Sequence, residues 1–158
     1  MKIITDPKRL AMPCESINLK DSHKIAKRMK LFMLNNKNVS DKSIGLACNQ
    51  LGLPGRVIMI KIKGRWVTFI NPTIESKSDE TVITKESCLS VPKKSVYVER
   101  SKSISLMSYQ YKKRISPKSF DLWASIISEF DDYSALVAQH EIDHLDGITI
   151  IERESPKV

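Results

Sequence analysis

The spacing of hydrophobic side chains predicts a helix near the start of the chain. Between residues 18 and 36, four of them recur at intervals of three and four positions: Ile25, Met29, Phe32 and Met33. Asn18 or Asp21 is suited to cap the first turn of this helix. The small-residue run GLACNQ, residues 45–50, then leads into turns.

An alternating pattern typical of β-strands fills the middle of the chain. RVIMIKIKGRWVTFINP, from residue 56, predicts two strands joined by a turn at Lys63 and Gly64. TVIT and SVYVERSKSISLMSY continue the pattern and put four apolar side chains on one alternating face: Val96, Val98, Ile104 and Leu106. FDLWASIISEF follows a turn at Pro117 and fits a strand or a helix.

A second helix is predicted from about residue 133 to residue 146. Asp131 or Asp132 caps it, and Gly147 ends it. ITIIE then predicts a last short strand. The pattern as a whole indicates an α+β fold of largely antiparallel sheets in one domain, residues 1–158, with an N-terminal helix and a central second helix.

Composition and charge narrow the classes of function. The formal net charge of +8 fits an anionic partner or a solvated basic surface, and the basic residues are spread along the chain. This distribution makes nucleic-acid binding the less favoured main function. The start of the chain lacks the apolar core of a signal peptide, and no stretch is long enough to cross a bilayer. We therefore expect a cytoplasmic protein whose partners are neither membranes nor specific DNA.

The second predicted helix carries QHEIDH, residues 139–144. His140 and His144 are four positions apart, so both project from one helical face and two imidazoles can bind one metal ion. A pair of satisfied core histidines is the alternative reading. Two of the chain's three histidines fall in this one motif, which favours a metal-binding HExxH helix. A catalytic metal takes a third protein ligand.

Cys88 is the better candidate for that third ligand. ESCLSVP places it in a short segment between strands with polar neighbours, where a thiol has no evident packing role. Cys14 and Cys48 are predicted to be structural thiols in a reducing compartment. The other candidates for the third ligand are weaker. His23 is predicted to be solvated. Three carboxylates follow the motif, but none stands on a second helix further along the chain, where a carboxylate ligand is usually found: Asp146, Glu152 and Glu154.

Three strings in order, GLACNQ, ESCLS and QHEIDHLDG, resemble the signatures of the peptide deformylases. The likeness covers nearly the whole chain. Ser43, Cys48 and Ser87 depart from the family's pattern, and Ser87 stands for a glycine, so its backbone must not need positive φ. We expect an insertion at about 109–122 and a short form without the C-terminal helix of many bacterial relatives.

The resemblance implies a metal-dependent hydrolase that removes the formyl group from the N-terminal formyl-methionine of newly made polypeptides. One divalent metal is expected on Cys88, His140 and His144. Fe(II) is implied for the cell, and Zn(II), Ni(II) or Co(II) can use the same ligands. Glu141 is expected to transfer protons. The resemblance gives the Gln50 amide and the Leu89 backbone N–H the role of binding the developing oxyanion.

The remaining expectations concern the substrate and the supporting residues. By resemblance, Gly45 pairs with an extended peptide, and an apolar slot for methionine is expected from four side chains: Ile44, Tyr133, Leu136 and Val137. Glu86 and Arg100 are expected to form a buried supporting pair, and Asp143 and Gln139 to orient the imidazoles.

Two alternatives stay open. One is a related metallohydrolase, such as a peptidase, that acts on another amide. The other is a catalytically inactive basic module associated with the ribosome. If the resemblance holds, the partners are N-formylmethionyl nascent peptides, with transient contact to the ribosome.

Overall fold

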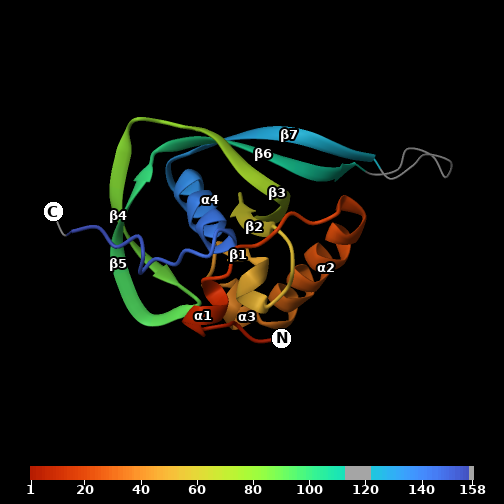
Figure 1. The fold of residues 1–158 in the computed structure, drawn as a ribbon, viewed down its shortest axis with the longest axis horizontal. Helices are drawn as coiled ribbons and strands as arrows, with labels where there is room; N and C mark the ends of the chain where they lie inside the picture. Colours follow the sequence, from red (N-terminus) through yellow and green to blue (C-terminus); the bar gives the residue numbers. More distant parts are fainter. Residues whose placement is uncertain (113–121, 157–158) are drawn as a thin grey trace.

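The chain folds into two antiparallel sheets that pack around the helix α4 (Asp132–Leu145) (Figure 1). The structure, a computed structural model, describes residues 1–112 and 122–156. The first sheet has the order β1-β2-β3-β6-β7, with strands β1 (Gly45–Ala47), β2 (Val57–Ile62), β3 (Arg65–Lys77), β6 (Ser103–Lys112) and β7 (Leu122–Asp131). The second is a two-stranded ribbon of β4 (Thr81–Cys88) and β5 (Val91–Ser101). The predicted α+β fold is confirmed.

Both predicted helices form, as α2 (Leu19–Asn35) and α4, and three short helices that the sequence did not predict accompany them. The short helices are α1 (Pro7–Leu10), α3 (Lys37–Ser40) and the 3₁₀ helix η1 (Cys48–Leu51). Asn18 caps α2, because its side chain accepts a hydrogen bond from the Lys20 N–H at 3.0 Å. Asp131 stands at the N-cap of α4 without a side-chain capping bond, and Gly147 follows the helix with φ of +76°. Among the described residues, no helix has both the length and the apolar character to span a bilayer.

The hairpin of β2 and β3 supports the main hydrophobic core. Ile62 pairs with Arg65, and the two residues between them have positive φ, as a tight two-residue turn requires: Lys63 at 48° and Gly64 at 78°. This confirms the predicted turn. The buried faces of β1, β2 and β3 then pack against α2 and α4 through side chains that include Met29, Leu46, Ile58, Phe69 and Leu145.

Two predictions about strands are wrong. Val96 and Val98 pack beside Cys88 and Ile150 in a small cluster, whereas Ile104 and Leu106 belong to the main core. The chain changes sheets between β5 and β6, so the four side chains do not share a face.

ITIIE forms turns instead of a strand. The Glu152 carboxylate accepts hydrogen bonds from both the N–H and the hydroxyl of Thr149, at 2.8 and 2.6 Å, and holds this segment in a turn. The part of the ambiguous FDLWASIISEF that the structure describes, from Leu122 on, forms strand β7. The predicted turn at Pro117 and most of the expected insertion lie outside the described residues.

Candidate metal centre

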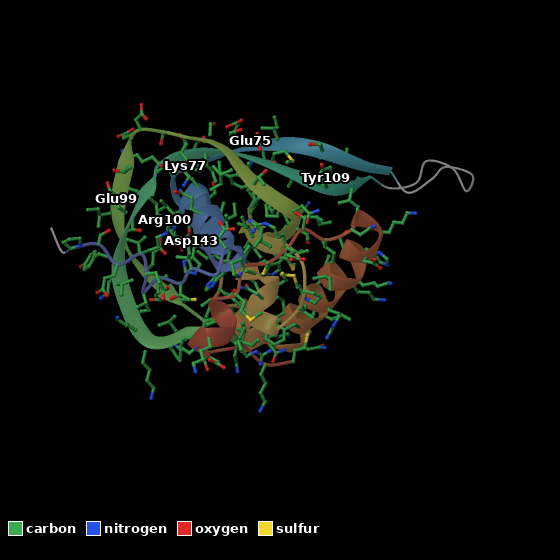
Figure 2. All side chains as sticks on the ribbon, in the orientation of Figure 1. Glu75, Lys77, Glu99, Arg100, Tyr109 and Asp143 are labelled. Atoms are coloured by element: carbon green, nitrogen blue, oxygen red, sulfur yellow. The ribbon has the colours of Figure 1, made fainter. Side chains whose placement is uncertain are left out.

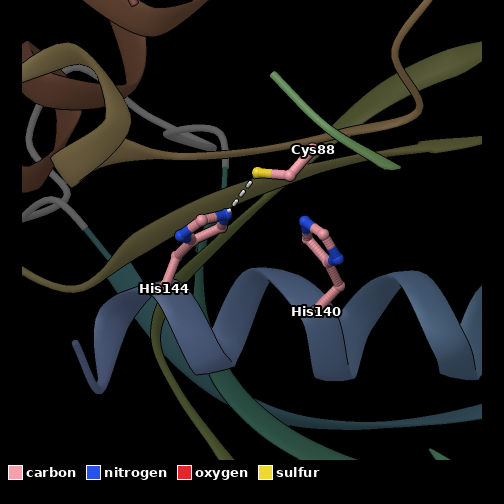
Figure 3. A group of neighbouring side chains, drawn as sticks. All are labelled: Cys88, His140 and His144. Atoms are coloured by element: carbon pink, nitrogen blue, oxygen red, sulfur yellow. Dashed lines mark hydrogen bonds between the residues drawn. The ribbon is translucent and has the colours of Figure 1, made fainter. Parts of the chain in front are cut away.

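A thiol and two imidazoles converge where the β4–β5 ribbon meets α4 (Figure 3). Cys88 is the last residue of β4, so it lies at a strand end and not between strands as expected, while His140 and His144 come from α4. One ligand atom from each lies within 4.8 Å of the others, and Cys88 Sγ is 3.1 Å from His144 Nε2. The i,i+4 spacing on α4 and the buried end of β4 therefore bring the three predicted ligands together.

The donor set fits a divalent metal. His140 Nδ1 donates to Glu86 Oε2 at 2.8 Å, which leaves the Nε2 lone pair of this ring for a metal. His144 Nδ1 is buried without a hydrogen-bond partner in the described part of the chain. Sulfur and imidazole ligands suit zinc, iron and neighbouring transition metals.

The two imidazoles differ in their affinity for a proton. Burial would lower the pKa of His140, but the hydrogen bonds with Cys88 and Glu86 outweigh it and raise that pKa to about 10. Burial lowers the pKa of His144 to about 3. The neutral imidazole of His144 is thus ready to act as a ligand, whereas a cation would have to displace a proton from His140.

Glu141 lies beside this group as a buried carboxylate. It is 4% exposed, and its Oε2 has no hydrogen-bond partner among the described residues. Burial raises its pKa to about 7. Its Oε1 lies over Gly45, where an added Cβ would be only 2.1 Å away. Gly45 is thus required here for close approach of Glu141, a contact that the sequence did not indicate.

Gln50 is held with its amide N–H groups towards the ligands. Its Oε1 accepts a hydrogen bond from the Ala47 N–H at 2.9 Å, which fixes the orientation of the carboxamide. Its Nε2 donates to Ser90 Oγ at 3.2 Å and lies 3.6 Å from Cys88 Sγ. Ser90, which sequence reasoning missed, is buried and two residues past the metal cysteine.

A network of ion pairs lies next to the ligands, and Figure 2 labels two of its members, Arg100 and Asp143. Arg100 donates to both carboxylate oxygens of Glu86 and, at 2.8 Å, to Asp143 Oδ2. Burial would raise the pKa of Glu86, but hydrogen bonds from His140 and Arg100 outweigh it and lower that pKa to about 2. Arg153, also missed from the sequence, donates to Asp143 Oδ1 at 2.7 Å. Glu86 and Arg100 thus form the buried pair that the sequence predicted.

The expectation that Asp143 and Gln139 orient the imidazoles is wrong. Asp143 binds Arg100 and Arg153, and the Gln139 side chain binds the backbone of Ser101. Glu86 is the residue that orients His140.

A cavity of about 440 Å³ opens onto the centre. Gln50, Leu89 and Glu141 line this cavity. So do all the residues predicted to bind the substrate: Ile44, Gly45, Tyr133, Leu136 and Val137. Tyr133 is 65% exposed, so it lies at the mouth and not on an inward face as expected. A second cavity of about 610 Å³ is lined by residues that include Arg100, Asp143 and Arg153.

The three departures from the family pattern fit their surroundings. Ser87 has φ outside the left-handed region, so a side chain is tolerated, and its hydroxyl lies 2.7 Å from that of Ser95. The Ser43 hydroxyl donates to the Val39 carbonyl at 2.8 Å. Cys48 is fully buried, as expected for a structural thiol.

Comparisons with known proteins agree with this geometry. The sequence model of the family described as "Polypeptide deformylase" matches residues 1–158. The peptide deformylase of Thermotoga sp. (strain RQ2) is 37% identical over 113 residues, which cover 72% of this chain and 63% of that protein. That of Finegoldia magna is 37% identical over 116 residues, covering 72% and 65%. The matched segments thus span less than two thirds of these relatives.

Solved structures of the same kind superpose on nearly the whole chain. A peptide deformylase from Thermotoga maritima has a TM-score of 0.79 at 29% identity and covers 99% of this chain and 97% of its own. The PDF of the Vibrio parahaemolyticus bacteriophage VP16T, in complex with actinonin, has a TM-score of 0.76 at 30% identity, covering 94% and 99%. Because the family's sequence model and these structures extend over the whole metal centre, the chain belongs to the polypeptide deformylase family.

Proposed function

We propose that this protein removes the formyl group from the N-terminal formyl-methionine of newly made polypeptides. The observation that carries the proposal is the buried Glu141 carboxylate, which lies in one cavity with the Cys88/His140/His144 ligand set and with Gln50. Membership of the family supports the same reaction. We place the reaction in the cytoplasm, in a single domain that acts on nascent chains with transient contact to the ribosome.

Cys88, His140 and His144 would hold the divalent metal. Fe(II) is the cation we propose in the cell, with Zn(II), Ni(II) or Co(II) as substitutes on the same ligands. A cation at this position supplies Lewis-acid chemistry, which polarises a carbonyl and lowers the pKa of water. Glu86 would keep His140 in the tautomer whose Nε2 is available as a ligand.

The edges of the two sheets offer a place for an extended peptide. β1 is an edge strand of the five-stranded sheet and β4 belongs to the two-stranded ribbon, and residues of both line the cavity. A peptide between them would pair its backbone with Gly45 and with residues 84–88 in β fashion. Its methionine side chain would enter the apolar part of the cavity at Ile44, Leu136 and Val137.

The residues around the formyl carbon divide the remaining work. Glu141 Oε2 would accept a proton from the attacking water and return it to the leaving amine. Gln50 Nε2 and the Leu89 N–H would donate hydrogen bonds to the oxygen that becomes negative. The fixed carboxamide of Gln50 supports this role, since its Oε1 already binds Ala47 and its Nε2 faces the ligands.

The test combines metal analysis with hydrolysis of formyl-Met-Ala-Ser. Glu141→Gln keeps the shape of the side chain, so metal content should stay constant while kcat falls by about 10²–10⁴-fold. Glu15→Gln, at an exposed site, is the matched control and should leave both quantities unchanged.

Each other outcome points away from the proposal. Near-normal turnover in Glu141→Gln would remove Glu141 from the reaction. Cleavage of an unformylated peptide in place of deformylation would favour the peptidase alternative. A metal-loaded protein that hydrolyses neither substrate would favour the inactive binding module.

A further inference from the structure

The exposed face of α2 is strongly basic. This 17-residue helix carries five basic side chains and one acidic side chain, which together account for half of the chain's formal net charge of +8. The basic ones are all exposed: Lys20, Lys24, Lys27, Arg28 and Lys30. We call this set the α2 basic face.

Most of this charge is not neutralised within the protein. Lys24 pairs with Asp21 at 2.9 Å, and it is the only member of the α2 basic face for which the described residues include an ion pair. That pair is well exposed, so solvent screens it and Lys24 stays available to a partner. Arg28 lies against the Met1 side chain, with Nη2 3.7 Å from Sδ, a contact that supplies no counter-ion for its charge.

The opposite side of α2 is already used by the protein itself. Its apolar side chains are buried in the main core, namely Ile25, Met29, Phe32 and Met33. A basic helix that binds a membrane surface needs an apolar face to enter the lipid. Two other large apolar side chains of α2 are exposed, Leu31 at 45% and Leu34 at 62%. Two leucines near the end of the helix do not make the wide apolar face that insertion into lipid needs, so the phosphates of a polyanion fit this charged surface better than a lipid bilayer.

We propose that the α2 basic face docks on the phosphate backbone of folded RNA. Lys20, Lys24 and Lys27 follow one line along the helix at intervals of four and three positions. At 1.5 Å per residue this line is about 10 Å long, and the flexible lysine side chains extend its reach over several phosphates. Contacts of this kind position a protein without reading sequence.

Further exposed basic residues lie between the α2 basic face and the cavity at the metal centre. Beyond α2, Lys37 is exposed on α3, and Lys42 borders the cavity that contains the metal centre. A docked RNA would therefore lie on the side of the molecule where α2 and α3 lead to the cavity. The inference goes beyond the proposed hydrolysis, because the charges of α2 lie outside the reacting groups.

The experiment measures binding to a fluorescent RNA hairpin with a stem of two helical turns, over a series of salt concentrations. The test variant carries four substitutions: Lys20→Gln, Lys24→Gln, Lys27→Gln and Arg28→Gln. The control variant removes the same number of charges from other exposed elements: Lys8→Gln, Arg65→Gln, Lys77→Gln and Lys94→Gln. Hydrolysis of formyl-Met-Ala-Ser, whose proposed cavity has no α2 residue in its lining, is measured in all three proteins.

Each phosphate contact contributes about 0.7–0.9 to the slope of log K against log salt, so four lost contacts should reduce the slope by about 3. We expect this reduction, with affinity more than about tenfold lower, in the test variant alone. Equal weakening in both variants would overturn the proposal, because only total charge would then matter. So would binding of the wild type to vesicles of anionic lipid but not to the hairpin. Unchanged hydrolysis throughout separates any failure here from a failure of the proposed enzymatic function.

Discussion

Replacing Gly45 by alanine should displace the Glu141 carboxylate while leaving the metal ligands in place. An alanine Cβ would lie 2.1 Å from Glu141 Oε1, 2.7 Å from its Cδ and 2.8 Å from its Cγ. Ordinary contact begins at 3.4 Å, so the carboxylate has to move by more than about 1 Å. The backbone of Gly45 is outside the left-handed region, so alanine is compatible with its conformation and this contact is the main perturbation.

A displacement of about 1 Å in a group that takes part in the reaction costs roughly 100-fold in rate. The assay is kcat and KM on formyl-Met-Ala-Ser for four proteins: wild type, Gly45→Ala, Glu141→Gln and the double variant. We expect Gly45→Ala to lower kcat by about 100-fold in the wild-type background. In the Glu141→Gln background it should lower kcat little further, because the glutamine at position 141 does not transfer protons and its displacement has no effect on the rate.

Two results would refute this reasoning. If Gly45→Ala lowers activity equally in both backgrounds, and mainly through KM, then Gly45 acts on the peptide and not through Glu141. If kcat is unchanged in the single variant, the cavity relaxes around the new methyl group and the position of Glu141 is not critical. Metal content should equal that of the wild type in all four proteins.

Three further predictions concern the metal and the slot. Cys88→Ala should lose the metal on dialysis and Cys48→Ala should keep it, since only the first thiol lies among the ligands; equal retention by metal analysis would contradict the assignment. Glu86→Gln should weaken metal affinity by about 10–100-fold in a chelator competition, because His140 loses its charged partner; unchanged affinity would remove that role. Val137→Trp should raise KM at constant metal content, and an unaltered KM would mean that methionine binds elsewhere.

The parts of the site that depend on local spacing could be predicted from the sequence. His140 and His144 share a helical face whatever the rest of the fold does, so the convergence of the two imidazoles follows from their spacing. The Asn18 cap and the turn at Lys63 and Gly64 are local in the same way.

Other features depend on contacts between distant segments. The partner of His140 is Glu86, which only the packing of the ribbon on α4 reveals, and the nearby Asp143 is turned instead towards two arginines. The approach of Glu141 to Gly45 likewise joins two segments far apart in the chain. ITIIE has the composition of a strand, but a side-chain acceptor at Glu152 gives its backbone a competing partner.

The position of Cys88 on a separate ribbon has a consequence for folding and opening of the molecule. A two-stranded ribbon is marginal in water by itself, and β4 and β5 form a sheet of their own. Cys88 and His144 are 56 positions apart, so a cation bound to both would close a long loop. Part of its binding free energy would then stabilise the packing of the ribbon against α4. Withdrawal of the cation should make the ribbon the least protected region in amide hydrogen exchange. Strand β4, whose residues line the cavity, would thus become ordered only once the cation has arrived, so a protein without the cation would lack one wall of that cavity.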